Sequence, residues 1–228
     1  MLTPEKIYLA ILTITQFIIL LTFHEWGHAK SAYMLGDPTA RDQGRLSLNP
    51  AVHIDPIGTL FLPLIGSLME GGFFGWAKPV PVNPYNLKKP RRDLMLIAAA
   101  GPFMNIVLTF AIFGLMHIFE LTHDYRPFDA RTYVGIKTFL RNSGIISVFL
   151  AAFNMLPLFP LDGFSVVNGL LPESVSRQFS KLAPYGMPIL MAIIFLPVII
   201  GIPNYIFDFL YFMTIEIYDF IGKIIGVR

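Results

Sequence analysis

The chain of 228 residues is 54% hydrophobic and only 14% charged, with a mean hydropathy of +0.61. Soluble domains carry about 25% charged residues, so this composition excludes an ordinary soluble protein and indicates a membrane protein. There is no cysteine, which excludes disulfides and thiolate ligands and leaves His, Asp and Glu as the candidate metal ligands. The formal charge of +2 does not indicate a nucleic-acid partner, because the basic residues flank apolar segments where the lipid bilayer explains them.

Apolar segments that could cross a bilayer, which takes about 20 residues, recur along the chain. We expect an all-α polytopic membrane protein with five to six transmembrane segments, forming one membrane-embedded domain over residues 1–228. A run at residues 57–69 contains a proline and is too short to cross comfortably, so it is ambiguous between a sixth span and a re-entrant or interfacial segment. The first span lacks a small-residue cleavage site and should be retained. The expected spans are Ile7–Leu35, Arg92–Leu121, Tyr133–Leu156, Gly186–Gly201 and Tyr205–Ile225.

The distribution of Lys and Arg predicts the orientation of these spans, since cytoplasmic loops are enriched in both. If the first span runs from outside to inside and the ambiguous run does not cross, 12 of the 17 basic residues fall inside and 5 outside. The sequence therefore predicts that the carboxyl end of the first span faces the cytoplasm.

Between the first two spans, short alternating pieces such as GRLSLNP (44–50) and GWAKPVPVNP (75–84) stand among turn signals. Pro79 and Pro81 are two residues apart, so on a strand they would remove amide donors from one edge only. This spacing indicates an edge strand from Trp76 to Val82, in a short membrane-associated β or re-entrant region. A polyproline-like loop at the membrane surface is the alternative.

The stretch HEWGH in the first span suggests a metal site. His24 and His28 are four residues apart, so on a helix both imidazoles project from one face. In the pattern HExxH two histidines bind zinc and the glutamate, here Glu25, acts on water. The five-residue pattern also arises by chance. In that case the stretch would be a helix end whose two histidines are hydrogen-bonded within the protein. A carboxylate inside a span costs about 2.5 to 3.5 kcal/mol, however, so a functional role is favoured.

A tetrahedral catalytic zinc needs a third protein ligand and an open position. His117 and His123 fall at the outer end of the second main span, on the wrong side. Asp162 follows the span that returns to the inside, so it is the third ligand we expect, with His53 as the next candidate. The alternative for Asp162 is a turn residue that caps the following helix.

Three motifs make a resemblance specific: HEWGH in the first span, AGPFMN (100–105) in the next and NMLPLFPLDG (154–163) closing the third. In this order they resemble the site-2 protease family of intramembrane zinc metalloproteases. NPAVHIDPIGT (49–59) and GWAKPVPVNP are similar to the compact branch of that family, which has neither a PDZ domain nor a nucleotide-sensing domain. The resemblance covers about residues 18–170; we expect a catalytic core over about 7–170 and further spans over about 186–225.

The resemblance implies one Zn2+ per chain, held by His24, His28 and Asp162, with Glu25 as the catalytic acid/base. It also implies that Asn154 holds the substrate backbone, and that the zinc lies inside a prokaryotic cell membrane toward the cytoplasmic face. The expected substrates are transmembrane proteins, with access restricted by prior trimming of the substrate or by a regulatory membrane partner.

Two further polar residues are weaker candidates for substrate binding. Asn105 lies in the small-residue stretch AAAGPFMN, where close helix packing with the amide bonded across helices is the alternative. His53 could line the site from a loop, but a loop histidine bonded to backbone fits as well.

Other functional classes predict different patterns. A membrane channel or transporter could use the same His, Glu and Asp cluster, but it should carry further polar residues across the membrane, and the outer halves of the spans are apolar. A catalytically dead scaffold should have lost the glutamate or a ligand. A di-iron oxygenase needs more histidines on one side than this chain has. We therefore favour an intramembrane protease.

Overall fold

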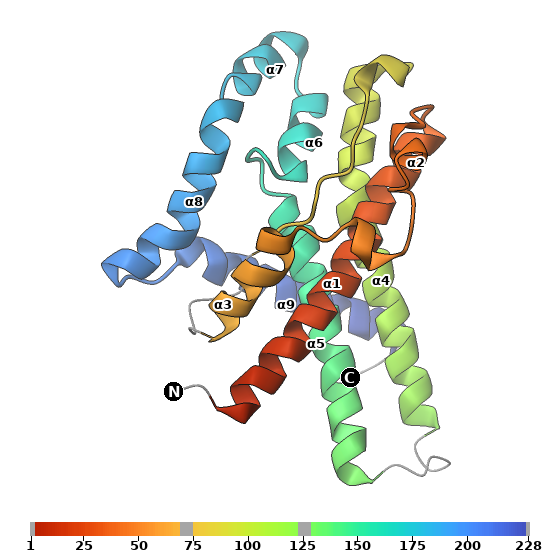
Figure 1. The fold of residues 1–228 in the computed structure, drawn as a ribbon, viewed down its shortest axis with the longest axis vertical. Helices are drawn as coiled ribbons and strands as arrows, with labels where there is room; N and C mark the ends of the chain where they lie inside the picture. Colours follow the sequence, from red (N-terminus) through yellow and green to blue (C-terminus); the bar gives the residue numbers. More distant parts are fainter. Residues whose placement is uncertain (1–2, 69–74, 123–128, 227–228) are drawn as a thin grey trace.

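The computed structural model describes residues 3–68, 75–122 and 129–226, and within these ranges its regular elements are all helices (Figure 1). Three long helices, α1, α4 and α5, form the centre, and the other helices lie around them. The elements in chain order are α1 (Pro4–Met34), α2 (Thr39–Asp42), η1 (Pro50–Val52), η2 (Pro56–Phe61), α3 (Leu62–Leu68), η3 (Pro84–Asn86), α4 (Pro90–Leu121), α5 (Ala130–Asn154), α6 (Asp162–Leu170), α7 (Glu173–Ser180), α8 (Ala183–Ile200) and α9 (Tyr205–Ile225).

Helix α1, which carries the histidine pair, has clear start and stop signals. Thr3 caps its first turn by accepting a hydrogen bond from the Lys6 amide, and Pro4 occupies the first helical position, where a missing amide proton costs nothing. The helix ends at Met34, just before Gly36, whose φ of 107° favours glycine. These signals leave the histidine pair inside one continuous helix.

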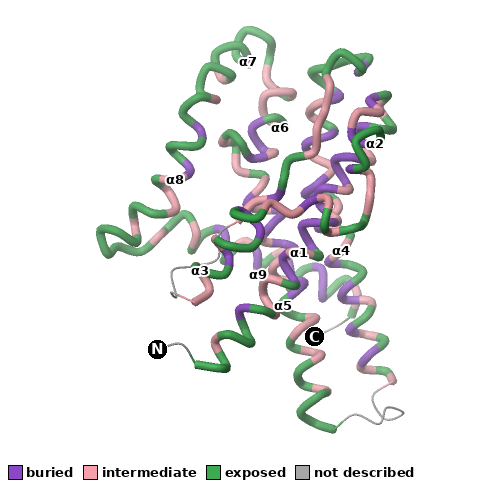
Figure 2. The backbone as a smooth tube through the Cα atoms, viewed as in Figure 1, coloured by how far each residue is buried: buried purple, intermediate pink, exposed green. Residues whose placement is uncertain are grey.

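The buried residues concentrate where α1, α4 and α5 meet (Figure 2). In lipid, helix association depends on close packing rather than on the hydrophobic effect, so small residues at the contacts matter. Gly27 of α1 is one: a Cβ atom there would lie 2.8 Å from the Ala100 carbonyl oxygen of α4. The close approach of α1 and α4 brings the first two motifs face to face.

Among the described residues four helices are long and apolar enough to cross a membrane: α1, α4, α5 and α8. They correspond to the first four expected spans. The fifth expected span forms α9, which carries Asp208, Glu216, Asp219 and Lys223 and is not among the four. In Figure 1 it runs crosswise behind the bundle. The expected count of five to six spans is therefore not confirmed.

The ambiguous apolar run forms η2 and α3, of 6 and 7 residues. At 1.5 Å per residue they cover about 20 Å, less than the roughly 30 Å of hydrocarbon. The last residue of the run, Met69, lies outside the described residues. The structure gives no support for a sixth span here, and it does not confirm a re-entrant segment.

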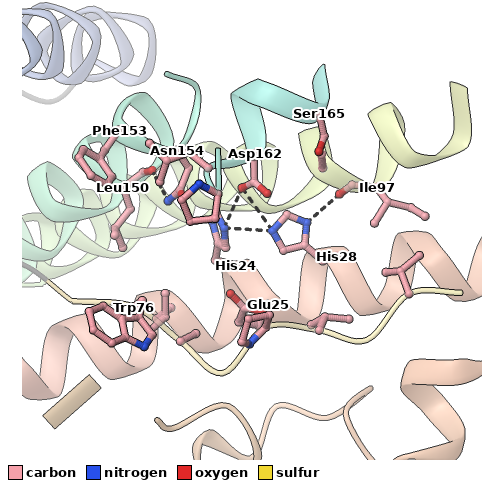
Figure 3. Close-up of a pocket in the computed structure, with 18 of the residues that line it drawn as sticks. His24, Glu25, His28, Trp76, Ile97, Leu150, Phe153, Asn154, Asp162 and Ser165 are labelled. Carbon is pink, nitrogen blue, oxygen red and sulfur yellow. Dashed lines mark hydrogen bonds and ion pairs between the residues drawn. The ribbon is translucent and has the colours of Figure 1, made fainter. Parts of the chain in front are cut away.

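The expected strand from Trp76 to Val82 is not confirmed, because residues 75–83 belong to no helix and no β-ladder. In Figure 3 the chain at Trp76 runs as an elongated stretch past the site, and we call residues 75–83 the extended segment. The segment has one paired side: the Trp76 amide donates to the Gly58 carbonyl and the Lys78 amide to the His53 carbonyl. The acceptors lie in helical turns and a loop, so there is no partner strand to continue the pairing toward Val80. The alternating sequence predicted a strand, but the segment has no regular partner strand to pair with.

Candidate metal centre

His24 and His28 lie one turn apart on α1 and are 3% and 8% exposed. Their Nε2 atoms are 3.1 Å apart, and the rings meet edge to face. Figure 3 shows both rings pointing from α1 toward α6. The helical spacing therefore brings the two imidazole nitrogens together, as HExxH predicts.

Asp162, the first residue of α6, lies opposite this pair. Its Oδ2 atom is 3.2 Å from Nε2 of His24 and 3.4 Å from Nε2 of His28 (Figure 3). Zinc with bonds of about 2.0 Å in a tetrahedral site separates its ligand atoms by about 3.3 Å. The three atoms therefore have the spacing that a tetrahedral zinc requires, and the Asp162 Oδ2 atom is buried without a hydrogen-bond partner.

The other ring nitrogens are hydrogen-bonded away from this centre. Nδ1 of His28 lies 2.7 Å from the Ile97 carbonyl oxygen, which can only accept a hydrogen bond. Nδ1 of His24 lies 2.6 Å from Oδ1 of Asn105. Such bonds place the proton on Nδ1 and leave Nε2 free to bind a metal.

Gly101 of α4 leaves space beside the two Nε2 atoms. A Cβ atom at this position would lie 2.3 Å from Nε2 of His28 and 2.7 Å from Nε2 of His24. Those distances are close to zinc–nitrogen bond lengths, so any side chain larger than hydrogen would compete with a metal for the space. The buried ligand atoms and this space together fit a zinc ion.

A cavity of about 500 Å³ opens beside the ligand set. Glu25, 8% exposed, lines it, and its carboxylate lies within 4.8 Å of the histidine nitrogens. The other walls come from the extended segment, including Trp76 and Val80, and from α4, α5, α6 and α8. A substrate in this cavity would meet Glu25 and the metal ligands together.

Asn154, expected to hold the substrate, is the last residue of α5 and lines the same cavity. Residues 155–161 are not helical, as the prolines in NMLPLFP indicate. Its Nδ2 atom donates to the Leu150 carbonyl at 2.9 Å, and no described residue donates to its Oδ1 atom. The Nδ2 atom of the carboxamide is therefore bonded within its own helix, and its Oδ1 atom can still accept a hydrogen bond from a substrate.

The two weaker candidates lie away from the cavity lining. Asn105 is fully buried between α1, α4 and α5, on the Nδ1 side of His24. His53 is 2% exposed, and its Nε2 atom lies 2.8 Å from the Ser47 carbonyl oxygen, the backbone contact named as its alternative. His117 is 16 residues beyond Gly101 on α4, about 24 Å along the helix, and His123 is outside the described residues.

Arg45 is a residue that the sequence did not single out. It is 6% exposed, and its Nη2 atom donates to the Lys78 carbonyl at 2.6 Å, on the extended segment. Burial lowers the pKa of its guanidinium, and the charge of Glu25 acts in the opposite direction. Its burial could be found only from the fold, since the sequence shows it as one basic residue among 17.

Comparison with known proteins gives concordant matches. The model of "Peptidase family M50" matches residues 12–197. The chain is 38% identical over 191 residues to "Putative zinc metalloprotease YwhC" of Bacillus subtilis (strain 168), which covers 83% of this chain and 81% of that protein. It is 28% identical over 213 residues to "Putative zinc metalloprotease Rip2" of Mycolicibacterium smegmatis, covering 93% and 74%. No solved structure matches at a significant level.

Proposed function

Because the chain belongs to peptidase family M50, we propose that it is an intramembrane zinc metalloprotease that cleaves peptide bonds within or near the transmembrane segments of membrane proteins. The observation that carries this proposal is the approach of His24, His28 and Asp162 around the space beside Gly101, with Glu25 on the wall of the adjoining cavity (Figure 3). Bacterial relatives support a prokaryotic cell membrane as its location.

When bound, zinc supplies Lewis-acid chemistry that acidifies water and polarises a peptide carbonyl. Glu25 takes the proton of the attacking water as general base and returns it to the leaving amine as general acid. His24, His28 and Asp162 would hold the metal, through the two Nε2 atoms and Oδ2 that lie together in this site. The apolar lining of the cavity limits bulk water, which strengthens the electrostatic interactions of these groups.

A transmembrane substrate must unwind before it is cut, since its scissile amide is held in a helix. The extended segment and Asn154 are the groups placed to hold the unwound chain. The Trp76 and Lys78 amides bond the enzyme's own loop, and their neighbours Ala77 and Pro79 line the cavity. On that side Ala77 offers an amide and a carbonyl, while Pro79 offers only its carbonyl. Hydrogen bonds to these groups and to the Asn154 carboxamide would replace part of the backbone bonding that the substrate loses.

The excess of basic residues on one side supports an active site toward the cytoplasm. The expected reactants are a transmembrane protein and water, within the lipid bilayer. We infer that prior trimming of the substrate or a regulatory membrane partner restricts access.

An ion or proton path is not favoured. Such a path needs ionisable groups that continue across the bundle. Among the described residues, the buried charged ones outside the site, Asp37, Arg45 and Asp93, lie between the end of α1 and the first turn of α4. Farther along the helices the buried polar side chains include Gln16, Thr109 and Ser143, which are uncharged and bond within the protein.

The test is co-expression with candidate single-span membrane proteins, comparing the wild type with Glu25→Gln. The variant should retain about one zinc per chain and lose cleavage, because it keeps the ligands and loses the acid/base group. His24→Ala, His28→Ala and Asp162→Ala should each lower zinc occupancy. Cleavage that survives Glu25→Gln would remove the mechanism, and full zinc occupancy in Asp162→Ala would remove Asp162 from the ligand set.

A further inference from the structure

We propose that Asn105 and Ser147 form a tautomer lock for His24: they hold its proton on Nδ1 and so keep the Nε2 lone pair directed at the metal. The inference rests on the proposed zinc site. It gives Asn105 a positioning role in place of the substrate-binding role considered from sequence, and it brings in Ser147, which the sequence did not indicate.

The orientation of the Asn105 carboxamide follows from its other partner. The Ser147 hydroxyl donates its single proton to the Asn105 backbone carbonyl at 2.8 Å. A serine oxygen that has given its proton can only accept at its lone pairs. The Asn105 group facing it at 3.3 Å must therefore be the Nδ2 amide, which donates. This leaves the Asn105 Oδ1 atom facing His24.

The protonation of His24 follows in turn. Oδ1 of Asn105 has no proton to give, so the 2.6 Å contact requires a proton on Nδ1 of His24. A neutral imidazole with that proton has its lone pair on Nε2, which faces His28 and Asp162. The position of the Nδ1 proton is thus fixed before the metal arrives, and the neutral ring can present its lone pair only at Nε2.

The two histidines are held by different means. His28 is held by the Ile97 backbone carbonyl, which belongs to the helix and stays in place when side chains change. His24 depends on one side chain, and the orientation of that side chain depends on Ser147. Asn105 and Ser147 are both fully buried, so bulk solvent does not reach either bond to replace it.

Neither residue is placed to contact a substrate. The described lining of the cavity includes neither Asn105 nor Ser147, and His24 stands between Asn105 and the metal position. Removing a hydrogen-bond partner that holds a metal-binding histidine typically lowers metal affinity by about 10- to 100-fold. A substrate-binding residue would leave zinc affinity unchanged.

The experiment measures zinc affinity by competition with a chromophoric chelator, using full-length protein in detergent and the Glu25→Gln background. Asn105→Leu, of similar size but without hydrogen bonds, should weaken zinc binding about 10- to 100-fold. Ser147→Ala should weaken it less, because the carboxamide is still present but free to turn. Asn105→Asp keeps an acceptor beside Nδ1 and should retain affinity.

Thr109→Val is the matched control. Thr109 is as buried as Asn105 and lies one turn away on α4, but its hydroxyl bonds only the Asn105 backbone carbonyl. The zinc affinity of Thr109→Val should equal that of the parent. Nitrogen-15 NMR of labelled histidines in zinc-free protein provides a second readout. It should show His24 protonated at Nδ1 in the parent, and a mixture of the Nδ1-protonated and Nε2-protonated tautomers in Ser147→Ala.

The outcomes separate the two proposals. A parent protein that binds zinc tightly, with Asn105→Leu equally tight or His24 protonated at Nε2, overturns the tautomer lock and leaves the zinc site intact. A parent that binds no zinc overturns both. If Asn105→Leu fails to fold, judged by helical content and gel filtration, Ser147→Ala and the NMR measurement still decide.

Discussion

Gly101 determines whether the histidine pair has room for a metal. We expect Gly101→Ala to abolish stoichiometric zinc binding, because the added Cβ would lie 2.3 and 2.7 Å from the two Nε2 atoms. Gly114→Ala on the same helix is the control, since nothing lies within 4 Å of its Cβ position and alanine favours a helix. Metal analysis of the purified variants checks this. One zinc per chain in Gly101→Ala would show that the metal lies elsewhere.

Asn154 should affect cleavage and not metal binding. A lost hydrogen bond to an uncharged group costs about 0.5 to 1.5 kcal/mol, and an unsatisfied buried partner about 1 to 3. We therefore expect Asn154→Ala to reduce cleavage roughly 10- to 100-fold, at about 1.4 kcal/mol per decade, with zinc near one per chain. Crosslinking of a trapped substrate in the Glu25→Gln background should also weaken. Loss of zinc from Asn154→Ala would instead make it a structural residue.

The histidine spacing could be read from sequence because both residues belong to one helix, whose periodicity fixes their relation. The contacts of Gly101 and Asn105 could not, because they depend on how α4 packs against α1. Asn105 is 81 positions from His24 and 42 from Ser147. Local patterns do not encode such pairings. The placement of Asp162 beside the histidines agrees with the topology argument, and its role as a ligand stays a prediction.

At the scale of elements, the extended segment shows that an alternating sequence is not enough to predict a β-strand. The alternation of Pro79, Val80, Pro81 and Val82 predicts a strand, and the structure assigns none there. A strand also needs a regular partner, and here the partner is a loop with short helical turns. The charges on α9 are visible in sequence, but apolar length alone led us to count that helix as a span.

Arg45 should hold this extended segment against its loop. We expect a cysteine at Val80, in a chain that has none of its own, to react faster with thiol reagents when Arg45→Met removes the 2.6 Å bond to the Lys78 carbonyl. Zinc content should not change, because Arg45 contacts no ligand. Arg41→Met is the control, since Arg41 lies four residues earlier, in α2, and its exposed side chain pairs with Asp42. Equal rates in both variants would contradict this role.

At the scale of the whole molecule, the helix lengths constrain how the protein sits in the bilayer. Helix α4 has 32 residues, about 48 Å at 1.5 Å per residue, against roughly 30 Å of hydrocarbon. Its ends must therefore extend beyond the hydrocarbon or the helix must tilt. The basic residues before α4 indicate that its first turn lies at the lipid headgroups. Gly101 lies about one third of the way along α4 from that end. A metal beside Gly101 would then lie below the surface of the leaflet where α4 begins.

This arrangement predicts three different labelling patterns for single cysteines with a membrane-impermeant thiol reagent. Lys89→Cys, exposed before α4, should react in inverted vesicles but not in intact cells. Arg131→Cys, exposed at the start of α5, should react only in intact cells. Val107→Cys, in the middle of α4, should react in neither, although its side chain is 42% exposed in the protein, because lipid covers it. All three should react after denaturation in detergent. If Lys89→Cys reacted only in intact cells, the active site would face the outside, and the cytoplasmic orientation proposed from the basic residues would be wrong.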